Sequence, residues 1–314
     1  SVDDGQGNQI PQTTVMGANP SNGSARTLYT NTNAGANWPT FAPNGSIVYA
    51  SMSTGTQTLV RSLTNAPNAA FTVINDGRTA PAPSWPAVSP DGRHLTFEAT
   101  INNAESIVTS GMDGSKVTIL GAGYTPSWSP DGKRITFSRV VGNGAEIMLV
   151  DAANGGNLTQ VTNAGCSSNK PRFSPDGRYL VFESNCGWNQ IAGGDANTTW
   201  NLFAVKPDGS GLTQLTQGAG ESGQPFWGKD GFIYFESNYG GTSNRDIWKI
   251  QPAGDLAGPA VTITPAPGKP GAPNLPPPGV PMKNSGSPKA GAGGTGSPGA
   301  STSKTPPKGG APNW

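Results

Sequence analysis

The sequence predicts an all-β fold assembled from one repeated four-stranded unit, and three observations support this prediction. The chain contains 45 Gly and 30 Pro among 314 residues, and both residue types disrupt the interior of helices. Only 12% of its residues are charged, against roughly 25% in an average soluble domain. One short turn motif recurs along the chain. A coiled coil or a helix bundle is therefore excluded.

The recurring motif begins with a residue followed by proline and ends with a glycine seven positions after that first residue. Five copies align without gaps, at residues 38–45, 85–92, 125–132, 170–177 and 224–231. Three copies end in Ser-Pro-Asp-Gly, in which proline presets φ, aspartate bonds its own backbone and glycine takes the positive φ that closes the turn. The first copy has Asn44 in place of Asp, and the last has Gly228 and Lys229 in place of Ser-Pro.

Each turn lies between two predicted strands. A short alternating apolar run follows every copy, at 47–49, 95–97, 135–137, 180–182 and 233–235, and such runs are typical of strands. A second strand pair follows, as at 107–110 and 117–120 or at 202–205 and 212–216. Since the motif glycines lie 47, 40, 45 and 54 residues apart, each period holds four strands. That arrangement is typical of a β-propeller blade.

The most complete copies carry the pattern Ser-Pro-Asp-Gly-Arg/Lys-x-Leu/Ile-x-Phe, at residues 89–97, 129–137 and 174–182. This pattern resembles the PD40 repeat of TolB-like and WD40-like propellers, and the resemblance spans about residues 11–264. It implies a fold rather than one function. Such repeats occur in periplasmic TolB-type scaffolds, in the lids of prolyl-oligopeptidase-type enzymes and in secreted binding proteins.

Counting strands predicts a β-propeller of five to six four-stranded blades, one of them incomplete, over residues 1–264. Residues 14–30 align with the outer strand pair at 202–216, so an outer pair precedes the first motif. Five motif hairpins and six outer pairs give 22 strands, whereas five blades need about 20 and six need about 24. We expect the incomplete blade to leave an open sheet edge, which favours pairing with another segment or chain.

Residues 265–314 form a Pro/Gly-rich tail that cannot bury a core. They hold 13 Pro, 11 Gly and five Lys without Asp or Glu, so the tail carries +5 and residues 1–264 carry −4. Proline-rich chain favours an extended form that lies along aromatic grooves. We therefore expect an extended tail that docks on a neighbouring subunit through Pro276, Pro277, Pro278 and Trp314. A flexible linker or a glycosylated stalk is the alternative.

The two cysteines lie on either side of one predicted hairpin, Cys166 before its first strand and Cys186 after its second. Both therefore emerge at the same end of the fourth blade, and a disulfide between them is geometrically reasonable. Two free thiols are the alternative. A disulfide implies an oxidising compartment. The chain opens at Ser1 without an apolar targeting segment, as a processed extracellular or periplasmic protein does, although a trimmed chain looks the same.

The residues that precede the motif prolines, which we call the anchor residues, are the candidate ligand site. We expect Trp38, Trp85, Thr125, Lys170 and Gln224 to surround one mouth of the propeller channel, with Tyr124 and Trp188 nearby. Two tryptophans at such a mouth suit a peptide or a sugar, which they bind by stacking. Packing between blades is the alternative role for these aromatic residues.

Three carboxylates end the second strands at matching positions: Glu98, Glu183 and Glu236. Converging carboxylates are typical Ca²⁺ ligands, so these residues are a weak candidate site for Ca²⁺. Pairing with Arg or Lys, or capping of backbone amides, is the other interpretation. We expect no other cofactor, because one His and two Cys leave little material for a zinc site.

The sequence favours a non-enzymatic protein. It contains no Gly-x-Ser-x-Gly elbow, and a net charge of +1 gives no case for nucleic acid. No run approaches the roughly 20 apolar residues that a membrane-spanning helix needs. The main hypothesis is an assembly subunit of an extracellular polymer, a homo-oligomer joined through the tail and the open blade edge. The alternative is a monomeric TolB-like periplasmic scaffold that binds another protein, and a carbohydrate-active propeller is a distant third.

Overall fold

The structure of the chain is a computed structural model. It describes residues 2–3, 9–10, 13–18, 25–31, 36–51, 57–63, 72–75, 80–186, 200–216, 220–238, 245–252, 256 and 262–265. The chain divides into two units, Ser1–Val280 and Pro281–Trp314, and every described residue belongs to the first unit. In the described part of the chain, no helix is long and apolar enough to cross a membrane.

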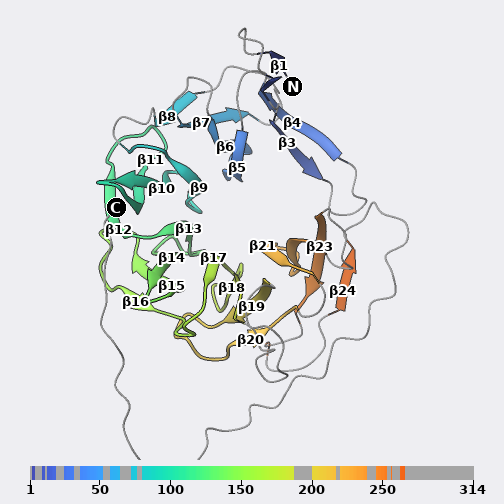
Figure 1. Ribbon diagram of the computed structural model, residues 1–314. Coiled ribbons are helices and arrows are strands. Elements are labelled where there is room, and N and C mark those ends of the chain that lie inside the picture. Colours follow the sequence, from blue (N-terminus) through green and yellow to red (C-terminus); the bar gives the residue numbers. More distant parts are fainter. Residues whose placement is uncertain are drawn as a thin grey trace, which may run out of the picture. The chain divides into compact units, whose positions relative to one another are not determined.

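Five four-stranded antiparallel sheets form the blades of a β-propeller (Figure 1). The first blade consists of β5 (Ala36–Phe41), β6 (Ser46–Ser51), β7 (Thr58–Leu63) and β8 (Thr72–Asn75). The second consists of β9 (Ser84–Val88), β10 (His94–Ile101), β11 (Ala104–Gly111) and β12 (Thr118–Ala122). The third consists of β13 (Tyr124–Trp128), β14 (Arg134–Val141), β15 (Gly144–Asp151) and β16 (Thr159–Gln160).

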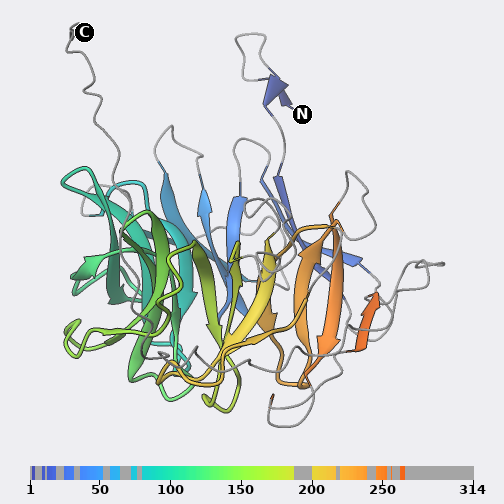
Figure 2. The same cartoon turned by 60° about the horizontal axis from the view of Figure 1, so that its bottom comes forward.

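The last two blades follow the same pattern. The fourth consists of β17 (Ser168–Phe173), β18 (Leu180–Ser184), β19 (Asn201–Val205) and β20 (Thr213–Gln214). The fifth consists of β21 (Ser222–Trp227), β22 (Ile233–Ser237), β23 (Asp246–Gln251) and β24 (Thr262–Pro265). The first strand of each blade lies nearest the axis of the ring, and the blades stand side by side around it (Figures 1 and 2). The predicted all-β propeller is confirmed.

The N-terminal region adds strands outside the five blades. β3 (Thr13–Ala18) pairs with β4 (Ala25–Asn31) in a separate two-stranded sheet, and β3 lies next to β5 of the first blade. The strand pair predicted at 14–30 therefore exists. The sequence does not predict a further short pair, β1 (Val2–Asp3) with β2 (Gln9–Ile10).

The hairpin between the first two strands of each blade closes with the predicted turn geometry. In the fourth blade, Asp176 Oδ1 accepts hydrogen bonds from the Ser174 hydroxyl at 2.7 Å and the Arg178 amide at 3.1 Å. Gly177 completes the turn with a φ of 74°. The same two bonds recur in the second and third blades. In the first blade Asn44 Oδ1 accepts from the following backbone in the same way, so this substitution preserves the turn.

Acid is expected to weaken these turns. Burial opposes ionisation of Asp176, but hydrogen bonds from Ser174 and Arg178, together with the Arg178 charge, lower the pKa of Asp176 to about 2. Such a carboxylate stabilises the fold above its unfolded pKa of about 3.9, and this stability is lost as the pH falls through the folded pKa. Urea unfolding should be measured at several pH values from about pH 5 to about pH 2. The free energy of unfolding should fall less steeply with pH in Asp176→Asn than in the unchanged chain. Equal losses would contradict this assignment.

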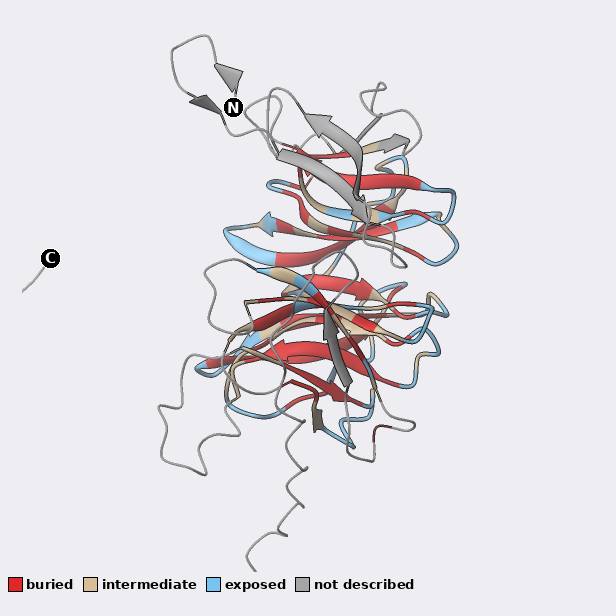
Figure 3. Ribbon diagram, turned by 90° about the vertical axis from the view of Figure 1, so that its right-hand side faces the viewer, coloured by how far each residue is buried: buried red, intermediate tan, exposed pale blue. Residues whose placement is uncertain are grey.

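Buried apolar clusters join neighbouring blades, and Figure 3 shows the buried residues running along the strands. Leu59 and Phe97 lie in the cluster between the first and second blades, and Ile107 and Phe137 lie in the cluster between the second and third. Ile147 and Phe182 lie in the cluster between the third and fourth blades. Leu202 and Phe235 lie in the cluster between the fourth and fifth. Among the described residues, no such cluster joins the fifth blade to the first. We call the junction between the fifth and the first blade the gap.

Candidate functional site

The first strand of every blade contains the same irregularity at its anchor residue. All five anchor residues have positive φ, which is 51° at Trp38, 48° at Trp85, 53° at Thr125, 53° at Lys170 and 52° at Gln224. The register with the second strand shifts at each of these positions. Proline lacks an N–H and disfavours the helical region for the residue before it. The strand therefore forms a bulge at the anchor residue and the proline that follows it.

The first strands extend beyond the bulge. They begin one or two residues before the anchor residue, at Ala36, Ser84, Tyr124, Ser168 and Ser222. Pairing resumes on the other side of the irregularity because a bulge absorbs the extra residue without ending the ladder. A positive φ at a non-glycine residue costs on the order of 1–3 kcal/mol. The same bulge therefore recurs at the anchor residue of all five blades.

Three anchor side chains meet across the axis. The ring centroids of Trp38 and Trp85 lie 5.4 Å apart, and their planes are tilted by 31°. Lys170 Nζ lies 5.4 Å from the centroid of the Trp85 ring, although Lys170 belongs to the fourth blade and Trp85 to the second. A side chain that reaches past the third blade points across the centre of the ring. All three side chains are half-buried, so they form a partly accessible cation–π cluster.

Two glutamates bind the bulged backbone of the blade that follows them. Glu98 Oε2 accepts a hydrogen bond from the Thr125 amide at 3.2 Å, and Glu183 Oε2 accepts one from the Gln224 amide at 2.7 Å. Glu183 Oε1 also pairs with Lys170 Nζ at 3.0 Å. Burial raises the pKa of Glu98, and the Thr125 amide partly opposes that rise. These carboxylates hold the anchor residues of neighbouring blades in place.

Tyr124 adds a polar group beside the anchor residues. Its hydroxyl donates a hydrogen bond to Asn169 Oδ1 at 2.9 Å. Burial, with the charges of Glu105, Glu98 and Glu183, raises the pKa of Tyr124 to about 12. The phenol therefore stays protonated at neutral pH and acts as a hydrogen-bond donor.

The remaining anchor residues differ in accessibility. The Thr125 side chain is only 4% exposed, and its hydroxyl lies 3.2 Å from the Ser138 hydroxyl. Gln224 is exposed, because its blade borders the gap. Thr125 therefore contributes a backbone amide to the structure and no binding surface. Of the predicted site residues that the structure describes, Trp38, Trp85, Lys170, Gln224 and Tyr124 are accessible.

The three aligned glutamates each have protein partners. Glu236 Oε1 accepts from Arg245 Nη1 at 2.7 Å, and Arg245 also pairs with Glu221. Glu98 and Glu183 bind backbone amides, as described above. In the described ranges, no group of three or more His, Cys, Asp or Glu is arranged to hold a metal ion. The pairing and capping roles therefore account for these carboxylates.

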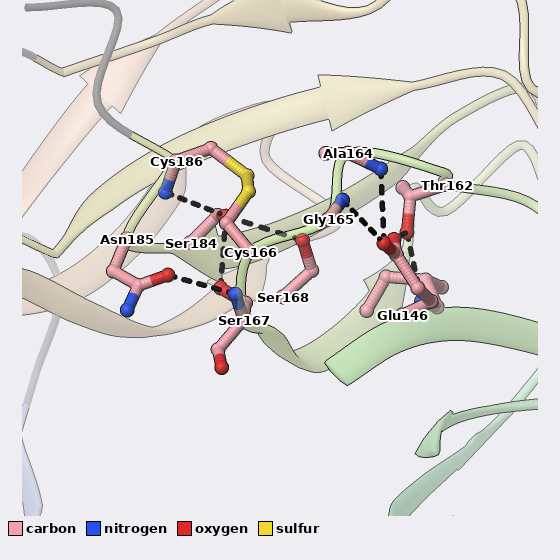
Figure 4. Close-up of a disulfide and its surroundings, with 11 residues drawn as sticks. Glu146, Thr162, Ala164, Gly165, Cys166, Ser167, Ser168, Ser184, Asn185 and Cys186 are labelled. Carbon is pink, nitrogen blue, oxygen red and sulfur yellow. Dashed lines mark hydrogen bonds between the residues drawn. A yellow bond between two sulfur atoms is a disulfide. The ribbon is translucent and has the colours of Figure 1, made fainter. Parts of the chain in front are cut away.

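Cys166 and Cys186 form the predicted disulfide, with Cα atoms 5.4 Å apart (Figure 4). The bond joins the chain just before β17 to the chain just after β18. Asn185 supports it, since its side-chain oxygen accepts from the Ser167 amide at 2.8 Å and its own amide donates to the Ser167 carbonyl at 3.0 Å. The disulfide thus fastens the ends of the hairpin that carries Lys170 and Glu183.

Glu146 is a functional support that the sequence does not reveal. It is 1% exposed, and its Oε1 accepts from the amides of Ala164 and Gly165 at 2.9 Å each (Figure 4). Its Oε2 accepts from the Thr162 hydroxyl at 2.5 Å. This carboxylate therefore holds the loop that leads into Cys166. The only signal in the sequence is a charged residue next to the apolar run Ile147–Val150, and no motif marks it.

Several predicted site residues lie outside the described residues. They are Trp188 in the insertion at 187–199 and the tail residues Pro276, Pro277, Pro278 and Trp314. Their roles in ligand binding or docking stay predictions.

Comparison with known proteins agrees with this architecture. Residues 83–199 match the PD40 family model, described as the TolB beta propeller domain. The match runs from the start of the second blade through the second strand of the fourth blade, and over this range the chain is similar to that domain. No curated protein sequence matches the chain.

Solved structures share the fold at low sequence identity. A putative TolB from Agrobacterium tumefaciens is 19% identical with a TM-score of 0.63, over 76% of this chain and 83% of that chain. TolB from Acinetobacter baumannii is 17% identical with a TM-score of 0.58, over 76% of this chain and 61% of that chain. An oligogalacturonate lyase in complex with manganese is 17% identical with a TM-score of 0.52, over 77% and 70% of the two chains. These likenesses show a fold that serves both TolB proteins and an enzyme.

Proposed function

We propose that the chain is a non-enzymatic, TolB-like scaffold that captures another protein at its anchor residues. The observation that carries this proposal is the cluster of Trp38, Trp85 and Lys170, which meet from three different blades. Tryptophan and a partly desolvated cation are typical of binding hot spots. The two TolB structures with the same fold support the class of function.

The chemistry of the cluster favours a peptide segment of the partner. The indole rings offer flat apolar surface, and the Tyr124 hydroxyl and the Gln224 side chain offer hydrogen bonds. Glu98 and Glu183 are engaged with backbone amides, and Glu183 also pairs with Lys170. A segment with an aromatic or aliphatic side chain therefore suits the indole rings best.

The disulfide supports a location outside the cytoplasm. Disulfides persist in the periplasm and in extracellular space and are rare in the reducing cytosol. Cys166 and Cys186 join the ends of a hairpin at the same end of the propeller as the anchor residues. The proposed capture therefore takes place in an oxidising compartment, where this part of the surface stays fixed.

Removal of both tryptophans is expected to abolish capture. The double variant Trp38→Ala, Trp85→Ala should lower the affinity for the captured protein at least about 30-fold, since hot-spot truncations cost about 2 kcal/mol or more. The partner is isolated by pull-down from a native periplasmic or secreted extract, and its affinity is then measured by calorimetry with the purified proteins.

A matched control separates binding from stability. Trp227 is a half-buried tryptophan of β21 that packs on Tyr179, with ring centroids 6.3 Å apart, away from the anchor cluster. Trp227→Ala should lower thermal stability but leave the affinity unchanged at a temperature where all variants are folded. Unchanged capture by the double variant would exclude the anchor residues as the binding site.

The gap favours a second candidate function, an assembly subunit in which copies of the chain join through the open β3–β4 edge and the tail. An open edge presents unpaired backbone donors and acceptors to another chain. Light scattering of the full chain should then give oligomers, and a chain ending at Pro265 should give monomers. Identical monomers in both samples would rule this candidate out.

A further inference from the structure

The first strands of the five blades carry charge in one blade only. These strands are β5, β9, β13, β17 and β21, and the structure describes every residue in them. Among these residues only Lys170 and Arg172 are charged, and both are cations on β17. The other blades have neutral residues at the position of Arg172, two after the anchor residue: Thr40, Ala87, Ser127 and Phe226. Arg172 is therefore a feature of the fourth blade and not of the repeat.

The guanidinium of Arg172 lies between the bulges of two neighbouring blades. Its Nη1 donates to the carbonyl oxygen of Pro126 at 3.3 Å and to that of Pro171 at 3.4 Å. These are the prolines that follow the anchor residues of the third and fourth blades. The guanidinium is therefore placed at the level of the anchor residues, where the Trp85 ring and Lys170 meet.

Most of the donors of Arg172 have no acceptor within the part of the chain that the structure describes. A guanidinium has five N–H donors, and Nη1 supplies two of them. In the described ranges, Nε and Nη2 make no hydrogen bond and no ion pair. Arg172 is only half-buried, so the edge formed by Nε and Nη2 is available to a ligand.

Glu183 acts on Arg172 through its charge but is engaged elsewhere. Its Oε1 pairs with Lys170 Nζ at 3.0 Å, and its Oε2 accepts from the Gln224 amide at 2.7 Å. Burial lowers the pKa of Arg172 to about 10, and the Glu183 charge opposes that shift. The guanidinium is thus cationic at neutral pH and partly desolvated, an arrangement that is costly without a paired anion. Two neutral carbonyls do not require a charged partner.

We infer that Arg172 binds the carboxylate of an aspartate or glutamate side chain in the captured segment, through Nε and Nη2. The inference rests on the proposed function, because it names the chemistry of the segment that the anchor residues capture. Guanidinium and carboxylate groups match in a planar geometry with two parallel hydrogen bonds. Since the guanidinium lies at the level of the anchor residues, a segment held at the indole rings reaches it with a side chain.

The aromatic and acidic side chains of the segment are expected two residues apart. Side chains at positions i and i+2 of an extended chain point to the same side, about 6–7 Å apart. The Trp85 ring lies 5.4 Å from Lys170 Nζ, and Lys170 is two residues from Arg172 on β17. A segment of the form aromatic-x-acidic therefore presents both groups to this surface.

Two capped peptides test the acidic group on the unchanged full chain. Acetyl-Phe-Gly-Asp-amide is expected to bind at least about tenfold more tightly than acetyl-Phe-Gly-Asn-amide, because only the first offers a charged acceptor. Calorimetry at low salt, where charge pairs are least screened, measures both affinities. Equal affinities, or binding of neither peptide, would overturn the inference. This comparison does not depend on the folding of any variant.

Substitution of Arg172 tests whether it is the residue that binds the carboxylate. Arg172→Gln should reduce the preference for the acidic peptide to below about twofold, and Arg172→Lys should keep part of it, since the charge remains without the planar fork. Arg178→Gln is the matched control, because Arg178 is exposed in the turn at the other end of the β17–β18 hairpin. The control should keep the full preference. A full preference in Arg172→Gln would assign the carboxylate to another residue.

A third peptide separates the two sources of a carboxylate. Acetyl-Phe-Gly-Gly with a free terminal carboxylate places the charge at the chain end. Binding of this peptide without binding of the aspartate peptide would contradict the assignment to an acidic side chain.

The variant Trp38→Ala, Trp85→Ala keeps this inference apart from the proposed function. If capture survives in that variant while the acidic preference depends on Arg172, the tryptophan site is wrong and the carboxylate site stands. If capture is lost there and Arg172→Gln leaves the preference unchanged, the proposed function stands and the carboxylate site is wrong.

Discussion

Replacing Ile147 with alanine is expected to lower the free energy of unfolding by about 2–5 kcal/mol. Ile147 is 0% exposed and lies in the cluster that joins the third blade to the fourth, with Leu180 and Phe182 on the facing strand. Truncation removes buried methyl and methylene groups and leaves a cavity, because strands held by ladders on both sides cannot collapse into it. Equilibrium urea unfolding measures the loss.

Ile247→Ala is the matched control, since the residue type and the place in the repeat are the same. Its side chain is 58% exposed toward the gap, so the expected loss is below about 1 kcal/mol. Similar losses for Ile147→Ala and Ile247→Ala would contradict the exposure of Ile247.

The sequence predicts the propeller well because its information is local and repeated. Ser-Pro-Asp-Gly defines a turn from the properties of four adjacent residues, and the turns at Asp91, Asp131 and Asp176 have the expected hydrogen bonds. The strand pair at residues 14–30 and the Cys166–Cys186 disulfide follow from the same alignment of repeats. Each of these features needs only the position of a residue within its own blade.

Features that depend on contacts between blades are harder to predict. Glu98 and Glu183 bind amides 27 and 41 residues away, and that distance varies with the loops between blades. Glu146 has no sequence motif at all. An alternating pattern of apolar residues also cannot tell that Ile247 is exposed while Ile147 is buried, since only the neighbouring blade decides this.

Removal of the disulfide is the second large effect expected. Cys166→Ser with Cys186→Ser should lower the free energy of unfolding by about 3 kcal/mol, the loop-entropy value for a bridge between residues 20 apart in sequence. The fold should persist, because Glu146 still holds the amides of Ala164 and Gly165. Urea unfolding of the double variant should coincide with that of the unchanged chain treated with a reductant.

The loss in the free energy of unfolding also shows how far the disulfide, rather than the Glu146 hydrogen bonds, fixes this end of the fourth blade. If the disulfide acts mainly on the unfolded chain, the double variant loses stability while capture by the anchor residues stays intact. Capture is then unaffected because Lys170 and Glu183 lie on the paired strands β17 and β18. If the bridge instead positions these side chains, capture weakens in the double variant while Lys170 Nζ loses its place near Trp85. Tryptophan fluorescence, recorded together with partner affinity, separates the two cases. A loss below about 1 kcal/mol would contradict the loop-entropy argument and indicate that the Glu146 hydrogen bonds already fix this loop.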